Sequence, residues 1–136
     1  MRNMSAKFEP IQVKDLITAK TEQSPTASGL RLMYFQLSNS PASEWIELFD
    51  NQRRIPMGRN MLGGCRADVR GNYIILDCIP EEIEKQHEYL KHDVSVANQG
   101  YQEYLKRVEA QALQAAQARK AELEKIEGLK SRLKFD

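Results

Sequence analysis

The sequence feature that most constrains the fold is a long, proline-free run of helix-forming residues that follows Pro80. From Glu81 to Leu133 almost every residue is a good or tolerable helix former, and such a run is typical of one long helix. Pro80 stands where prolines commonly begin helices, and the glutamates after it suit the positive end of the helix dipole. We therefore predict a helix or a helical hairpin from Pro80 to Phe135.

Within this run, apolar residues recur in alternating steps of four and three, which places them on one side of a helix. The run contains one plausible break, Asn98-Gln99-Gly100, because a glycine after asparagine can end a helix in the left-handed conformation. A glycine inside a helix costs only about 1 kcal/mol relative to alanine, so we favour a continuous helix over a hairpin that breaks near Gly100. The stripe consists of Ile83, His87, Leu90, Val94, Ala97, Tyr101, Tyr104 and Val108.

Upstream of Pro80 the sequence predicts an α+β fold. Apolar runs at residues 8–17, 30–37, 67–70 and 73–78 indicate strands. Gly71-Asn72 joins the last two in a tight hairpin, whereas the polar residues 18–28 indicate a loop. Ser40-Pro41 begins a short helix that ends near Arg53. The predicted order is strand, strand, helix, strand, strand and long helix, with a small antiparallel sheet.

The strands at 30–37 and 73–78 carry apolar side chains on both faces, which predicts a sheet covered on both sides. We expect the short helix on one face and the first turns of the long helix on the other, anchored by Ile83, Leu90 and Val94. The predicted organisation is an α+β head domain over residues 1–79 and a long C-terminal helix or helical hairpin over residues 80–136.

Composition and motifs argue against several classes of function. Twenty basic and 19 acidic side chains give a net charge of +1, so there is no global attraction to nucleic acid or to an anionic membrane. Cys65 and Cys78 form no CxxC pair and indicate reduced thiols in an intracellular protein. No apolar stretch approaches the roughly 20 residues of a membrane span, which predicts a soluble, cytoplasmic protein. Because no catalytic or cofactor motif is present, we predict no enzyme activity and no cofactor.

The long helix is the leading candidate for function. Beyond Val108 its stripe weakens to alanines before large aliphatic residues restore it. A solvated helix held by local propensity would explain the alanine-rich part, but exposed aliphatic side chains favour packing against a partner. We therefore predict a protein–protein interaction or scaffolding module that forms homo-oligomers or binds a helical protein. The predicted contacts are Tyr101, Tyr104, Leu123, Ile126 and Leu133.

The alternative is nucleic-acid binding by the Arg/Gly-rich residues 53–70, in which five arginines accompany one acid, Asp68. Arginine binds phosphate through two parallel hydrogen bonds, and glycines allow a backbone to approach an anion closely. A solvated loop whose arginines pair with acids such as Glu44, Glu47 or Glu82 explains the same residues without a ligand. The candidate anion contacts are Arg53, Arg54, Arg59, Arg66 and Arg70.

Overall fold

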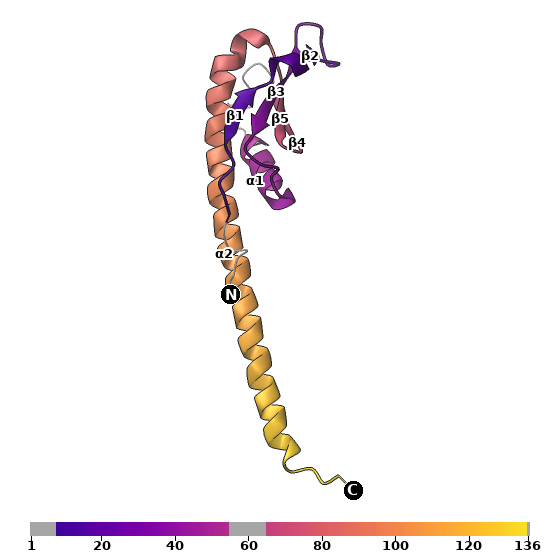
Figure 1. Ribbon diagram of the computed structural model, residues 1–136, viewed down its shortest axis with the longest axis vertical. Helices are drawn as coiled ribbons and strands as arrows, with labels where there is room; N and C mark the ends of the chain where they lie inside the picture. The colour runs from indigo at the N-terminus through magenta and orange to yellow at the C-terminus, as the bar shows by residue number, and fades with distance from the viewer. Residues whose placement is uncertain (1–7, 55–64, 136) are drawn as a thin grey trace. The chain divides into compact units, whose positions relative to one another are not determined.

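The computed structural model describes residues 8–54 and 65–135, without the side chain of Arg54. Within these residues, five strands form one antiparallel sheet in the order β1-β3-β5-β4, with β2 also paired to β3 (Figure 1). The predicted α+β class, with a small antiparallel sheet and a long C-terminal helix, is confirmed. The elements are β1 (Val13–Leu16), β2 (Glu22–Gln23), β3 (Arg31–Leu37), α1 (Ser43–Arg54), β4 (Arg66–Arg70), β5 (Tyr73–Cys78) and α2 (Ile83–Lys130).

The β4–β5 hairpin follows the prediction closely. Gly71 has a φ of 59°, whereas Asn72 has no positive φ, as expected for a tight turn with glycine first. The turn sets the register of the hairpin, from Arg70 opposite Tyr73 to Arg66 opposite Asp77. Every later pairing in the hairpin follows from this one turn.

The short strand β2 was not predicted, because its residues lie in the polar segment that indicates a loop. Glu22 and Gln23 are exposed, yet their backbone pairs with Leu32 and Arg31 of β3. β1 pairs with the other half of the same edge of β3, from Phe35 to Leu37. Backbone pairing at an edge needs no apolar side chain, so a search for apolar periodicity misses such a strand.

The sheet has one buried face, which corrects the prediction that both faces are covered. Burial alternates along β3 and β5, so successive side chains are core and half-buried. Both helices pack on the same face, since Trp45 and Phe49 of α1 belong to the same core as Leu90 and Val94 of α2. Figure 1 shows α1 and the first turns of α2 beside the sheet. The strand side chains in this core are Met33, Phe35, Leu37, Ala67, Ile74, Leu76 and Cys78.

The prediction for the outer face was wrong because this face also carries large side chains. Tyr34 and Tyr73 lie there with their ring centroids 5.8 Å apart, and Leu32 and Ile75 are half-buried in the same alternation. Cross-strand neighbours shield one another in this way, and neither described α-helix covers this face. Apolar residues on both faces therefore do not require helices on both faces.

Helix α2 is continuous through Gly100, so the favoured prediction is confirmed and the hairpin is not formed. A Cβ atom added at Gly100 would lie 3.3 Å from Leu48 Cδ1 of α1, so the glycine allows the two helices to approach closely. A 3-10 turn over Pro80–Glu82 precedes α2. The helix ends at Lys130, before the predicted end at Phe135, and backbone hydrogen bonds from Arg132 and Leu133 close a last turn.

The chain divides into two compact units, residues 1–102 and residues 103–136. We call them the α+β unit and the C-terminal unit. The division falls inside α2 and not at Pro80, since Leu90 and Val94 are buried in the core of the α+β unit and Ile83 packs against it. The predicted anchoring of the helix by these three residues is confirmed.

Candidate functional site

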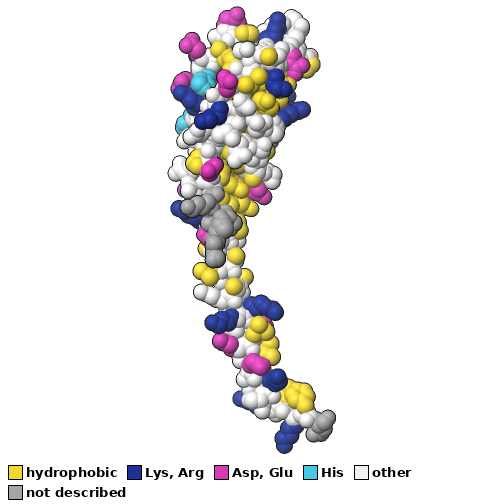
Figure 2. Space-filling model, viewed as in Figure 1, with side chains coloured by type: hydrophobic (Ala, Val, Ile, Leu, Met, Phe, Trp, Pro, Cys, Tyr) yellow, Lys and Arg dark blue, Asp and Glu magenta, His cyan; other side chains and the backbone are white. Residues whose placement is uncertain are grey.

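The C-terminal unit exposes a row of large apolar side chains. Each residue of this row is between 43% and 60% exposed, whereas Leu90 in the same helix is fully buried. Figure 2 shows hydrophobic side chains at several levels of this part of the helix, among Lys, Arg, Asp and Glu side chains. The row consists of Val108, Leu113, Leu123, Ile126, Leu129 and Leu133.

Most of these residues follow a seven-residue repeat. Steps of three and four, taken in alternation from Leu105, place apolar residues along one side of the helix, with charged residues only at Arg119 and Glu122. Leu123 borders this stripe, whereas Leu113 lies away from it. Large side chains occupy the two ends and alanines lie between the first end and the charged centre. Within α2 the repeat consists of Leu105, Val108, Ala112, Ala115, Arg119, Glu122, Ile126 and Leu129, and Leu133 continues the spacing beyond the last helical residue, Lys130.

The predicted contact residues fall into two groups. Leu123, Ile126 and Leu133 are exposed in the C-terminal unit, as an interface requires. Tyr101 belongs to the α+β unit, where its ring meets the edge of the Phe8 ring at a centroid distance of 4.8 Å and packs against the core. Tyr104 is half-buried. The structure therefore brings the three aliphatic residues together and assigns Tyr101 to the fold.

Arg53 is not exposed to an anion. Its Nη1 atom lies 2.8 Å from Asp93 Oδ2, and the two side chains are only 7% and 1% exposed. Its guanidinium also lies over the Phe49 ring, 5.9 Å from the centroid. The expectation that the arginines pair with acids holds for this residue, but its acid comes from α2 and not from the predicted Glu44, Glu47 or Glu82.

The remaining arginines do not form a cluster in the described residues. Arg66 and Arg70 are exposed at opposite ends of β4, and Arg66 lies 3.8 Å from Asp68. Arg59 and the side chain of Arg54 lie outside the described residues. The structure thus places one of the five candidate anion contacts in the core and two on an edge strand.

The outer sheet face holds a small polar and aromatic cluster that sequence reasoning missed. The Tyr34 hydroxyl donates a hydrogen bond to Glu22 at 2.7 Å, and Lys20 Nζ lies 5.5 Å and 5.3 Å from the Tyr34 and Tyr73 ring centroids. The hydrogen bond to Glu22 raises the pKa of Tyr34 above its ordinary value of 10.0, because the bond retains the phenolic proton. Glu22 and Lys20 precede β3 in a segment without apolar periodicity, so only tertiary structure brings them together with the tyrosines.

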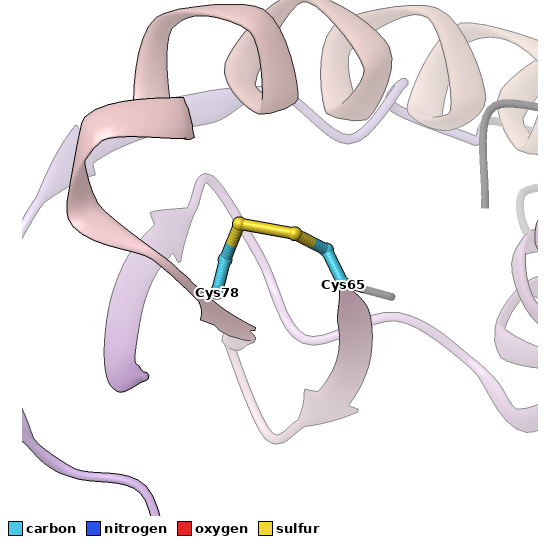
Figure 3. The surroundings of a disulfide bond; sticks show 2 residues. All are labelled: Cys65 and Cys78. Atoms are coloured by element: carbon cyan, nitrogen blue, oxygen red, sulfur yellow. A yellow bond between two sulfur atoms is a disulfide. The ribbon is translucent and has the colours of Figure 1, made fainter. Parts of the chain in front are cut away.

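Cys65 and Cys78 form a disulfide, which corrects the prediction of reduced thiols. The hairpin register places the two residues directly opposite each other, with their Cα atoms 4.9 Å apart, and Figure 3 shows the bond joining the residue before β4 to the last residue of β5. Both residues are buried in the core. In this state neither sulfur is a thiolate nucleophile or metal ligand.

Asn98 is the residue whose importance sequence reasoning missed most clearly. Its Oδ1 accepts hydrogen bonds from the Ile11 backbone N–H at 2.9 Å and from Trp45 Nε1 at 2.8 Å, and its Nδ2 donates to the Ile11 carbonyl at 2.9 Å. One carboxamide thus joins the N-terminal segment, α1 and α2. The sequence offered Asn98 as a helix-breaking signal, and nothing local reveals its distant hydrogen-bond partners.

The described residues offer no metal site and no membrane-crossing helix. No group of three or more His, Cys, Asp or Glu side chains within 8–54 and 65–135 could hold a metal ion. In the same part of the chain, no helix combines the length and the apolar character that a membrane span requires. His87 stacks on Phe35 with ring centroids 5.7 Å apart, so its imidazole packs against the sheet.

Comparison with known proteins gives no relative: no protein-family model, curated protein or solved structure matches the chain.

Proposed function

We propose that this protein is a non-enzymatic interaction or scaffolding module that self-associates or binds a helical partner through its C-terminal unit. The observation that carries the proposal is the exposed apolar stripe of residues 105–133. The α+β unit already has a closed core, in which Trp45, Phe49 and Leu90 are fully buried. The core of the α+β unit therefore does not require the side chains of the stripe.

Burial of the stripe would supply substantial binding free energy. Covering one large aliphatic side chain completely contributes about 1.5–3 kcal/mol, and Leu123, Ile126, Leu129 and Leu133 are all exposed on neighbouring turns. Helices in proteins gain most of their stability when an apolar face packs against another element. A partner helix supplies that packing.

A site-specific photo-crosslinker tests the proposal in the cell of origin. A photoreactive residue at position 126 should yield a discrete adduct with a second copy or with another protein, because Ile126 lies within the stripe. The same residue at position 113 is the matched control, since Leu113 is at least as exposed as Ile126 but lies away from the stripe. Equal labelling at both positions, or no adduct at position 126, would refute the proposal.

Nucleic-acid binding by residues 53–70 has less support. Arg53 is committed to Asp93, and Arg66 lies beside Asp68. The other described candidate, Arg70, is a single exposed charge on an edge strand, whereas electrostatic binding to nucleic acid uses several neighbouring cations.

The disulfide bears on where such a module acts. Disulfides persist in oxidising compartments and are rare in the cytosol. The Cys65–Cys78 bond therefore favours an oxidising compartment over the cytoplasmic location that the sequence predicts.

A further inference from the structure

The charged centre of the apolar stripe indicates which partner fits it. Arg119 and Glu122 occupy core positions of the seven-residue repeat, where charges are costly unless they are paired. In a parallel pair of copies each of these residues would face its own counterpart, so like charges would meet in two successive layers. Like charges in contact across an interface destabilise it. A parallel homodimer is therefore disfavoured.

An antiparallel pair resolves this conflict. We propose that a second copy of this chain packs antiparallel against residues 112–129, with the two-fold axis between Arg119 and Glu122. Arg119 of each copy then faces Glu122 of the other, so the two-fold axis relates two equivalent pairs of opposite charges. The inference rests on the proposed function and names its partner.

The same register matches large residues with small ones. In an antiparallel pair, each step toward the C-terminus on one helix is a step toward the N-terminus on the other. The position of the axis therefore fixes which core residues of the two copies face each other. Layers that alternate large and small side chains fill the space between helices evenly. A parallel pair would instead stack alanine on alanine and leucine on leucine. Within α2 the facing pairs are Ala115 with Ile126 and Ala112 with Leu129.

The positions that flank the stripe fit the same arrangement. In an antiparallel coiled coil, the residues that flank the core along one edge of a helix lie beside the residues at the equivalent positions of the other helix. Glu109 there approaches Lys130 of the second copy, giving opposite charges, and Ala116 approaches Leu123. Leu123, which borders the stripe, is therefore covered as well. Core charge, core size and edge charge all favour one register.

The pairing is also confined to the C-terminal unit. The outermost helical layer joins Ala112 of one copy to Leu129 of the other, and upstream core positions such as Tyr101 are already packed within the α+β unit. The self-complementary residues all lie on one chain, as an isologous dimer interface requires. A different partner protein would need to reproduce this pattern in reverse order.

A charge-reversal series on the full-length protein tests the proposal by light scattering and sedimentation over a wide concentration range. Arg119→Glu and Glu122→Arg should each weaken dimerisation by about tenfold or more, because each creates like-charged layers. The double variant Arg119→Glu/Glu122→Arg should restore the wild-type dimer. In a parallel dimer a single reversal exchanges one like-charged layer for another and changes little, so an unchanged dimer would overturn the proposal.

Cysteine crosslinking tests the orientation directly, under conditions that leave the Cys65–Cys78 bond intact. Ala115→Cys mixed with Ile126→Cys should form a disulfide-linked heterodimer, whereas Ala115→Cys alone should not crosslink. Self-crosslinking of Ala115→Cys would show a parallel pair and overturn the inference. A wild-type protein that stays monomeric at every concentration would overturn it too. The proposed function would survive that result if position 126 still crosslinks to a different protein.

Discussion

Asn98 connects three parts of the α+β unit through one carboxamide. Its three hydrogen bonds, to the Ile11 backbone and to Trp45 Nε1, lie in a half-buried environment where water replaces them poorly. Arg53 and Asp93 form a second polar link between α1 and α2, at 2.8 Å and almost completely buried. Single polar residues thus determine how the two helices meet.

We predict that Asn98→Ala lowers the free energy of unfolding by about 3 kcal/mol, since a lost hydrogen bond costs about 1 kcal/mol and a stranded buried donor costs more. Denaturant unfolding followed by Trp45 fluorescence measures the loss. The neighbouring exposed residue supplies the control, and Gln99→Ala should change stability by less than about 0.5 kcal/mol. Equal effects of the two substitutions would show that the Asn98 hydrogen bonds contribute little.

At the scale of the element, the β4–β5 hairpin carries the covalent constraint. The turn at Gly71 sets a register in which Arg66 faces Asp77, and the next position outward joins Cys65 to Cys78. The bond closes the hairpin at the end far from its turn. It therefore restricts the unfolded chain over the whole hairpin.

We predict that Cys65→Ala/Cys78→Ala lowers the free energy of unfolding by about 2–4 kcal/mol, because the loop is no longer closed in the unfolded state. Denaturant unfolding with and without reductant measures this loss. Reductant should destabilise the wild type and leave the double variant unchanged. Alkylation of both cysteines in unfolded, unreduced wild-type protein would show that the bond is absent.

At the scale of the whole molecule, one helix serves two units with different roles. Its first part, from Ile83 to Gln102, buries Leu90, Val94 and Ala97 in the core of the α+β unit. Its second part lies in the C-terminal unit and has no such core. The structural and the proposed interaction roles are therefore separable at Gln102.

Truncation after Gln102 should leave the stability of the α+β unit within about 1 kcal/mol of its value in the full chain, because no buried core residue is removed. Truncation after Asn98 should cost about 2–3 kcal/mol more, since it also removes Tyr101 and its packing on Phe8. Thermal unfolding at low protein concentration, with near-ultraviolet circular dichroism as the signal, compares the two. A large loss on truncation after Gln102 would contradict the division into two units.

Much of the architecture was predictable because it depends on local preferences. The continuous helix α2 follows from helix propensity and an apolar periodicity that passes through Gly100 without losing step. The hairpin follows from Gly71-Asn72 between two apolar runs. The disulfide was predictable in principle as well, since this turn places Cys65 opposite Cys78 once the pairing is extended to the end of the hairpin.

Propensity, periodicity and turn chemistry act between residues close in the chain, so they predict both α-helices and every strand except β2. Tertiary packing, by contrast, places both helices on one face of the sheet, brings Asn98 to Ile11 and Trp45, and brings Arg53 to Asp93. Those contacts join residues distant in sequence, so no local pattern specifies them. They arise from close packing of the assembled core, which leaves each buried polar group only the partners that the fold brings within reach.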